Sequence, residues 1–224
     1  MDWNQVPTPV RVCCAALWEA GYEACPVGGC IRDTLLGRPP GDWDVASSAL
    51  PETVVSLFPR TVPTGLRHGT VTVLLGDMSL EVTAFRREGD YADGRHPDAV
   101  SFGVGLREDL ARRDFTVNAM ALRRDGTLAD PFGGQADLDA GLIRCVGNPD
   151  RRFQEDALRI LRALRFSSSL GFSIEPETAA ALRADRARLG KVSAERIAAE
   201  LVKLVCGADA PRVLREFPEV VARV

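Results

Sequence analysis

A strand-to-helix turn with two glycines is the feature that most limits what this chain can fold into. A GGCIRD run at residues 28–33 follows a strand-like segment at 23–27. Gly28 and Gly29 at such a turn let the backbone approach a phosphate, with the first N–H groups of the helix pointing at the anion. Arg32, one turn into the helix, adds a positive charge. A glycine pair alone is weak support, because many tight turns contain one.

The DWD triplet at residues 42–44 predicts a metal site on one face of a strand. Asp42 and Asp44 alternate along the strand, so both side chains leave the same face. Two carboxylates there repel each other, and a hard cation between them stabilises the arrangement. Glu81 taken alone would lie on an exposed sheet face, but with the aspartates upstream we interpret it as a third ligand. Three carboxylates holding two Mg²⁺ ions suit an in-line phosphoryl transfer, in which one metal activates the attacking hydroxyl and the other neutralises the leaving group.

Hydrophobic periodicity divides the chain into a mixed α/β part and a helical part. Residues 6–20 predict an amphipathic helix, and two β-rich runs flank Gly76-Asp77 as a hairpin. Further expectations are strands at 23–27, 42–46, 70–75, 79–85, 119–123 and 127–130, helices at 30–37 and 52–58, and a long mobile loop at 86–99. From about residue 150 onward the spacing is that of helices alone. We therefore predict an α/β head with a mixed sheet at 1–148 and an all-α neck at 149–224.

Composition and charge narrow the chemistry further. No apolar run approaches the roughly 20 residues that a membrane-spanning helix needs, and the N-terminus shows no secretory signal. Six cysteines without a CxxC pair, and two histidines, argue against a zinc site and predict reduced cysteines in a cytoplasmic protein. The net charge of −3 divides into −6 over residues 1–110 and +3 over residues 111–224. This asymmetry suits metal binding in one half and phosphate binding in the other, and it also fits an ordinary solvated surface.

A second polar run, RRDFTVN at 112–118, gathers charged and amide groups in what we predict to be one turn. A solvated helix end would explain its two arginines, but less easily the residues that follow them. The alternative interpretation is contact with ribose hydroxyls and phosphates, with Arg112, Asp114 and Asn118 as the candidates.

The run EDALRILR at 155–162 is expected to open the first neck helix. Asp156 and Arg159 are three residues apart, so an intrahelical ion pair contributing about 0.2–0.5 kcal/mol is the simpler interpretation. The sharper one is base recognition, since an aspartate only accepts hydrogen bonds and an arginine only donates them. Cytosine and adenine offer an amino donor beside a ring-nitrogen acceptor, whereas guanine and uracil show the reverse. One such pair would take C and A and reject G and U without a nucleic-acid template.

Together these motifs resemble the class II tRNA nucleotidyltransferases, the CCA-adding enzymes of the polymerase-β-like superfamily, which also includes bacterial poly(A) polymerases. The resemblance runs from about residue 20 to 205. It rests on GGxxRD at 28–33, DxD at 42–44, EVT at 81–83, RRDFTxNAMA at 112–121, DPFGG at 130–134, EDxxR at 155–159 and SxERI at 193–197. Each motif is modest support, whereas the set in the family's order is specific.

The resemblance implies Mg²⁺-dependent addition of C, C and A from CTP and ATP to the 3′ end of tRNA, with release of pyrophosphate. It implies that Asp42 and Asp44 bind metal and that Glu81 supports them. The other implied roles are triphosphate binding by Gly28, Gly29 and Arg32, sugar and phosphate contact by Arg112, Asp114 and Asn118, and base reading by Asp156 and Arg159, with Arg162 as a further candidate for base or phosphate contact.

Members of this family add CCA, CC alone or the terminal A alone. The flexible loop is reduced in CC-adding members, and a full-length segment at 86–99 favours an enzyme that still adds A. Residues 64–70 lack the Gly-Arg-Arg-Phe run usual in poly(A) polymerases. Relatives continue into a helical body and tail, so a chain ending at Val224 is expected to be a fragment, or a minimal form that needs another chain. A poly(A) polymerase and a non-catalytic nucleotide- or RNA-binding fragment remain alternatives.

Overall fold

A seven-stranded mixed sheet is the centre of the first of two compact units. The computed structural model describes residues 1–89 and 99–224. The first unit comprises residues 1–88, 100–113 and 117–134, and the second consists mainly of residues 114–116 and 135–224. The observed division therefore falls after Gly134, whereas the sequence placed it after residue 148.

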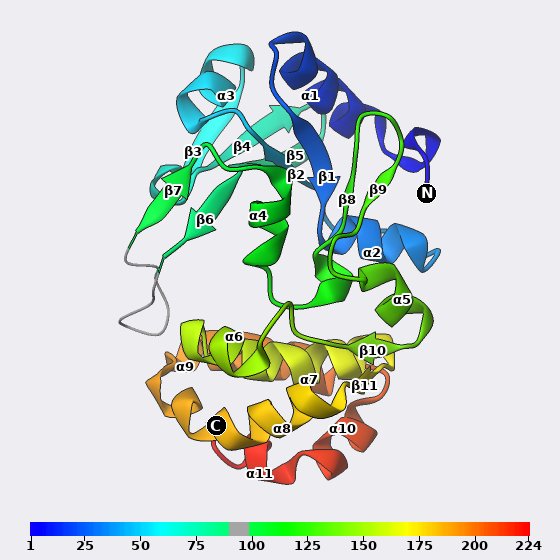
Figure 1. The fold of residues 1–224 in the computed structure, drawn as a ribbon, viewed down its shortest axis with the longest axis vertical. Coiled ribbons are helices and arrows are strands. Elements are labelled where there is room, and N and C mark those ends of the chain that lie inside the picture. Colours follow the sequence, from blue (N-terminus) through cyan, green and yellow to red (C-terminus); the bar gives the residue numbers. More distant parts are fainter. Residues whose placement is uncertain (90–98) are drawn as a thin grey trace. The chain divides into compact units, whose positions relative to one another are not determined.

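The sheet has the strand order β3-β4-β5-β2-β1-β8-β9 (Figure 1). Its members are β1 (Ala24–Val27), β2 (Asp44–Ser47), β3 (Thr61–Gly65), β4 (Thr70–Leu75), β5 (Met78–Ala84), β8 (Ala121–Leu122) and β9 (Leu128–Ala129). Neighbouring strands are antiparallel except β2 and β5, which run parallel, so the expected mixed sheet is confirmed. The hairpin at Gly76-Asp77 is also confirmed, with Leu75 opposite Met78. Strand β3 was not anticipated; it contains Pro63, which is tolerated because β3 lies at the sheet edge.

Two helices pack against one face of this sheet. They are α1 (Thr8–Glu19), which contacts β1 and β2, and α3 (Pro51–Leu57), which contacts β4 and β5 (Figure 1). Val10 and Leu17 of α1 and Val54 of α3 are buried there in a single hydrophobic cluster with the sheet. The unit also contains α2 (Gly29–Leu35), α4 (Leu106–Ala111) and the 3₁₀ turns Trp3–Gln5 and Leu66–His68. The predicted helices at 6–20, 30–37 and 52–58 are thus confirmed with shifted ends.

Strand alternation sends acidic side chains to the opposite face of the sheet. In the paired strands β2 and β5, Val45 lies opposite Val82, and Asp44 lies opposite Glu81. Both valines are buried in the cluster beneath α1 and α3. Because successive strand residues point to opposite faces, the two carboxylates project from the other face.

The segment predicted as a loop at 86–99 connects two short paired strands, the first of which lies within it. Strands β6 (Arg86–Glu88) and β7 (Val100–Phe102) pair antiparallel, with Arg86 opposite Phe102. The loop prediction is therefore wrong for residues 86–88, where three consecutive charged residues concealed a strand. Its remaining part, 90–98, lies outside the described residues.

The second unit is mostly helical. Its helices are α6 (Pro149–Glu155), α7 (Leu158–Leu170), α8 (Pro176–Asp185), α9 (Ala194–Val205), α10 (Ala210–Glu216) and α11 (Pro218–Val221), with a 3₁₀ segment at Arg186–Lys191, and α5 (Gly134–Asp139) begins it (Figure 1). Helix α7 packs against α9 and α10, and α6 packs against α8. The all-α prediction for 149–224 is wrong only at β11 (Ser173–Ile174), which pairs in parallel with β10 (Leu142–Ile143); a two-residue strand leaves no periodicity to detect.

Five of the six cysteines are buried, and Cys206 is exposed. Burial raises the pKa of the Cys13, Cys25 and Cys30 thiols to about 12. These thiols therefore stay protonated near neutral pH and serve as small apolar side chains.

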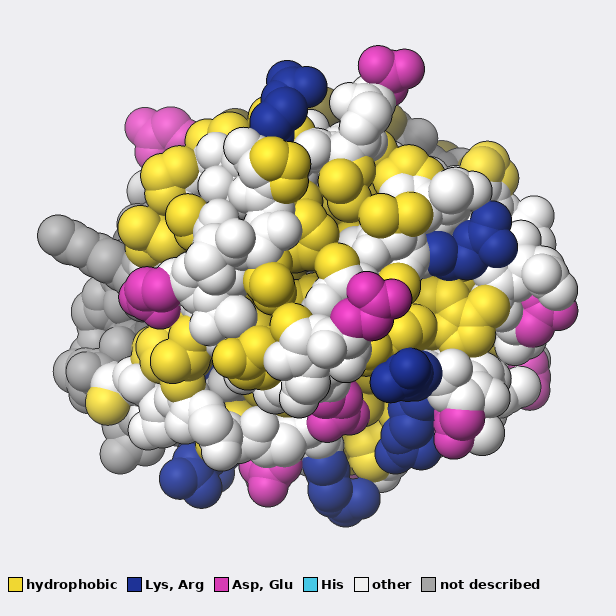
Figure 2. Space-filling model, turned by 90° about the horizontal axis from the view of Figure 1, so that it is seen from above, with side chains coloured by type: hydrophobic (Ala, Val, Ile, Leu, Met, Phe, Trp, Pro, Cys, Tyr) yellow, Lys and Arg dark blue, Asp and Glu magenta, His cyan; other side chains and the backbone are white. Residues whose placement is uncertain are grey.

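Exposed hydrophobic side chains on the first unit are scattered. Val12 of α1 and Val55 of α3 are 50% and 43% exposed. Figure 2 looks onto the side of the first unit that carries these helices and shows hydrophobic side chains interleaved with polar and charged ones. Single exposed hydrophobic residues are normal for a folded surface. Within the part of the chain that is described, no helix is long and apolar enough to cross a membrane.

The close approach of helices α7 and α9 gives a test of the second unit's packing. A Cβ on Gly207, just after α9, would lie 2.8 Å from the carbonyl carbon of Ser168 in α7 and would also overlap the Ser168 hydroxyl. We expect Gly207→Ala to lower the free energy of unfolding by about 1–3 kcal/mol, because the α7 backbone must move. Gly190→Ala, whose Cβ would meet no atom within 4 Å, is the control and should change stability by less than about 0.5 kcal/mol. Urea unfolding measures both, and equal stabilities would contradict this packing.

Candidate active site

Asp44 and Glu81 are neighbours on the sheet face opposite α1 and α3. They are register partners in β2 and β5; Asp44 is partly buried and Glu81 is exposed. Asp42 lies just before β2 rather than within it, and the side chain between the two aspartates, Trp43, is buried. Burial raises the pKa of Asp44 to about 6; Arg113 opposes this shift, while the negative charges of Glu81 and Asp42 add to it. The three acidic residues predicted from the sequence thus share one electrostatic neighbourhood.

These carboxylates do not form a closed metal cage. Within residues 1–89 and 99–224, no group of three or more His, Cys, Asp or Glu side chains is arranged to hold a metal ion. Asp44 and Glu81 instead line a polar cavity of about 260 Å³ together with Arg86, Arg112 and Arg113. Two carboxylates beside three guanidinium groups suit a polyanion that arrives with a cation.

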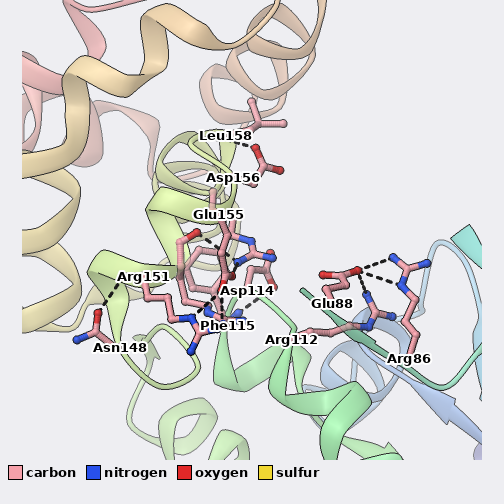
Figure 3. A network of polar contacts seen from close by, with 12 residues as sticks. Arg86, Glu88, Arg112, Asp114, Phe115, Asn148, Arg151, Glu155, Asp156 and Leu158 are labelled. Carbon is pink, nitrogen blue, oxygen red and sulfur yellow. Dashed lines mark hydrogen bonds and ion pairs between the residues drawn. The ribbon is translucent and has the colours of Figure 1, made fainter. Parts of the chain in front are cut away.

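Two of the cavity arginines share an acidic partner. Glu88 in β6 accepts hydrogen bonds from Arg86 Nε at 3.0 Å and from Arg112 Nη1 at 3.1 Å (Figure 3). Burial and the nearby charge of Arg112 lower the pKa of Arg86, and Glu88 opposes that shift. Arg112, a predicted phosphate ligand, is thereby fixed at the cavity.

The glycine turn lies beside a further arginine. Gly28 is the N-cap of α2 with φ of +86°, a conformation that favours glycine, and a Cβ there would lie 2.9 Å from Arg113 Nη1. Arg32 is buried and donates from Nε to Asp33 at 2.8 Å and from Nη1 to Asn118 Oδ1 at 2.6 Å. The structure therefore brings three predicted residues, Gly28, Arg32 and Asn118, into direct proximity.

The RRDFTVN run is not one turn, contrary to expectation. Arg112 caps the end of α4, Phe115 forms an isolated bridge with Cys145, and Thr116–Asn118 is a 3₁₀ turn. Asp114 belongs to the second unit, whereas the arginine and the asparagine belong to the first. Phe115 is fully buried and bridges to Cys145, so the run leaves the helical path that ends with α4.

In the second unit Asp114 binds a neck arginine. Its Oδ2 accepts from Arg162 Nε in α7 at 2.8 Å. Burial alone would lower the pKa of Arg162, but the carboxylates of Asp114, Glu200 and Asp156 raise it above its usual value. Arg162 thus stays charged beside the two other residues proposed to read the base.

The EDALRILR run does not form a single helix, which corrects the sequence interpretation. Helix α6 ends at Glu155, and Asp156 is extended (φ −146°, ψ 106°). The Asp156 carboxylate accepts from Leu158 N at 3.0 Å and so caps α7 (Figure 3), and it pairs with Arg196 of the SxERI motif at 2.8 Å. Arg159 pairs with Glu155 at 2.7 Å. The ion pairs that Asp156 and Arg159 form, with Arg196 and Glu155, thus differ from the intrahelical Asp156–Arg159 pair that their spacing favoured.

Four residues of the first unit's charged cluster are not among those predicted from the sequence: Arg86, Glu88, Asp109 and Arg113. Arg86 and Glu88 fell in a segment interpreted as loop. Asp109 precedes Arg112 and Arg113 by three and four residues, a helical spacing that could have signalled contact.

Comparison with known families agrees with this geometry. A family model described as the poly A polymerase head domain matches residues 25–144, more than half of the chain. The chain belongs to the poly A polymerase head-domain family. A second model, described as a probable RNA- and SrmB-binding site of polymerase A, matches residues 171–219. The family resemblance and the fold expected from the motifs are thus confirmed.

Individual members of the family are also similar to this chain. The CCA-adding enzyme of Geobacillus thermodenitrificans is 52% identical over 194 residues, 87% of this chain and 48% of that enzyme. The structure of the Bacillus stearothermophilus CCA-adding enzyme in complex with CTP is 44% identical with a TM-score of 0.86, over 93% of this chain and 51% of that one. A tRNA nucleotidyltransferase solved with a primer tRNA and an incoming ATP analog is 29% identical with a TM-score of 0.78, over 94% and 60%. The chain spans about half the length of the curated relatives it matches.

The raised pKa of Asp44 predicts a conflict between stability and function. We expect Asp44→Asn to raise the free energy of unfolding by about 1–2 kcal/mol in EDTA, because it removes a charge that the fold disfavours. The gain should be full above pH 6, shrink as the pH falls, and vanish only below 3.8, the ordinary pKa, where the wild-type carboxyl becomes protonated in the unfolded as well as the folded state. Asp77→Asn, in the exposed hairpin turn, is the control. Urea unfolding at several pH values measures this, and a destabilised Asp44→Asn variant would contradict it.

Proposed function

We propose that this chain is the catalytic and nucleotide-selecting part of a tRNA nucleotidyltransferase, transferring C and A from CTP and ATP to the 3′ end of tRNA. The observation that carries this proposal is the cavity that joins Asp44 and Glu81 to three arginines. Support comes from relatives whose structures hold CTP, or a primer tRNA with an incoming ATP analog. A cytoplasmic location and a head–neck division of these roles remain predictions.

We infer that Mg²⁺ binds at Asp42 and Asp44 together with the triphosphate, with Glu81 beside them. Mg²⁺ keeps several waters and is commonly bound by one or two carboxylates plus substrate phosphates, so it needs no cage of protein ligands. The crowding of negative charge around Asp44 supports this assignment, because a cation would relieve it. When bound, the metal would activate the attacking hydroxyl and neutralise the leaving pyrophosphate.

The side chains of the first unit supply the remaining contacts in this proposal. The turn at Gly28 and Gly29 brings backbone close to the phosphates, and Arg32 and Arg112 contribute positive charge. Asn118, which accepts a hydrogen bond from Arg32, would contact the sugar. Charge-assisted hydrogen bonds to phosphate oxygens are stronger than neutral ones, which favours the triphosphate over the nucleoside.

Base selection is assigned to the second unit. Asp156 would accept the amino group of cytosine or adenine, and Arg159 would donate to the neighbouring ring nitrogen. Arg162 is a further contact for base or phosphate, and Asp114 orients it. Arg196 holds Asp156, and Glu155 holds Arg159. Both base-contacting side chains are therefore ordered before a nucleotide binds.

Incorporation of labelled nucleotides tests the reaction. We expect label from CTP and ATP, but not from GTP or UTP, to enter tRNAs that end at the discriminator base, after C, or after CC; sequencing the products distinguishes CCA, CC and A addition. Asp44→Ala should abolish incorporation while tRNA binding persists, and Asp77→Ala is the exposed control. Long A tails on unrelated RNA would favour a poly(A) polymerase. Nucleotide binding without incorporation would favour a non-catalytic fragment.

Competition between nucleotides tests the base-reading pair. Arg159→Ala should lower kcat/KM for CTP and ATP by about 10–100-fold relative to UTP and GTP, because a hydrogen bond from a charged donor is lost. Arg188→Ala, which removes a surface arginine paired with Asp185 three residues earlier, is the matched control. Equal losses for all four nucleotides would show that Arg159 does not read the base.

A further inference from the structure

A buried aspartate lies behind the arginines of the candidate active site. Asp109 in α4 has 0% exposure. Its Oδ1 accepts from Arg112 Nε at 2.9 Å and from the backbone N–H of Arg86 at 3.4 Å, and its Oδ2 accepts from Arg113 Nη2 at 3.3 Å. A buried carboxylate is costly unless it is paired and hydrogen-bonded, and here each oxygen has such a partner.

The three residues that Asp109 contacts all line the polar cavity with Asp44 and Glu81. Three guanidinium groups in so small a space repel one another, so counter-charge behind them is needed to keep them there. Glu88 supplies part of this charge to Arg86 and Arg112. Asp109 is the described carboxylate that pairs with both Arg112 and Arg113.

Arg113 connects Asp109 to the reacting centre. Its Nη1 lies where a Cβ on Gly28 would approach to 2.9 Å, and its charge opposes the rise in the pKa of Asp44. Its Nε is buried without a hydrogen-bond partner among the described residues, so the contact with Asp109 is an important restraint on this side chain.

We propose that Asp109 is a positioning residue: it holds Arg112 and Arg113 so that both guanidinium groups meet the β- and γ-phosphates of the incoming nucleotide. This inference rests on the proposed nucleotidyltransferase function and assigns a role behind its phosphate site. A purely structural role for Asp109 would stabilise α4 without affecting phosphate recognition in particular.

Binding of CMP, CDP and CTP to the full chain in Mg²⁺ distinguishes these roles. Asp109→Asn keeps the shape, but it removes the charge and turns an amide group towards one of the arginines. We expect its affinity for CTP to fall about tenfold or more, for CDP by less, and for CMP hardly at all, because the loss follows the phosphates. In turnover, KM for CTP should rise while the preference for CTP over UTP stays unchanged.

Matched variants separate positioning from stability. Asp137→Asn removes another buried carboxylate, paired with Arg144 in the second unit; it should lower the melting temperature without changing the ratio of CTP to CMP affinity. Because Asp109 acts through both Arg112 and Arg113, Asp109→Asn should lower CTP affinity less in an Arg113→Ala background than in the wild type, with the remaining loss passing through Arg112. Asp109→Glu, which keeps the charge, should retain more CTP affinity than Asp109→Asn and serves if the latter fails to fold.

An equal loss for all three nucleotides, or no loss for CTP, overturns the positioning role. Additive effects in the double variant overturn the path through Arg113. Because the comparison of CMP, CDP and CTP affinities needs no turnover, it can be interpreted even if the wild-type chain adds nothing to tRNA, an outcome that would refute the proposed function and leave the phosphate-positioning result intact.

Discussion

Parallel pairing of β2 with β5 places Asp44 opposite Glu81, and two carboxylates on neighbouring strands repel each other unless positive charge lies close by. Several charged side chains of the first unit offset this repulsion. Arg113 approaches Asp44 from the RRDFTVN run, and Arg86 and Arg112 line the same cavity. These cations in turn need counter-charges, which Glu88 and Asp109 supply from outside the catalytic set. In this site the arginines offset the charge of Asp44 and Glu81, and Glu88 and Asp109 in turn hold the arginines in place.

Such an arrangement contributes more to position than to stability. Removing two ions from water costs free energy that their attraction only partly offsets, so buried ion pairs are weak support for a stable fold. These ion pairs mainly fix orientation. Because Arg112 donates from Nε to Asp109, its guanidinium group has few orientations left for its remaining donors. The raised pKa of Asp44 shows that its ionised form is unfavourable in the fold, at the position where the proposed chemistry needs a carboxylate.

Local patterns predicted from the sequence succeeded where a short period or a turn residue decides the structure. The interpretation of Glu81 as a companion of the aspartates agrees with its pairing opposite Asp44, and Gly76 marked the hairpin between β4 and β5. They failed where tertiary contacts override periodicity. The apolar spacing after Asp156 continues that of a helix. In the structure, however, helix α6 ends before Asp156, and the Asp156 carboxylate caps the next helix, α7. Asp109 was missed because a carboxylate three residues before an arginine is typical of a solvated helix, and only the structure shows it fully buried.

Asp156 and Arg159 could discriminate between bases although both already bind other side chains. Asp156 uses one oxygen to cap α7 and the other to bind Arg196, and a carboxylate oxygen accepts more than one hydrogen bond. Arg159 is held through Nη1, and a guanidinium group carries five donors. A base with an amino group beside a ring nitrogen would add to these contacts without displacing them, whereas guanine or uracil would set a carbonyl against the carboxylate. Because the protein partners fix both side chains beforehand, neither could rotate to accommodate the wrong base, and rejection would follow from preorganisation.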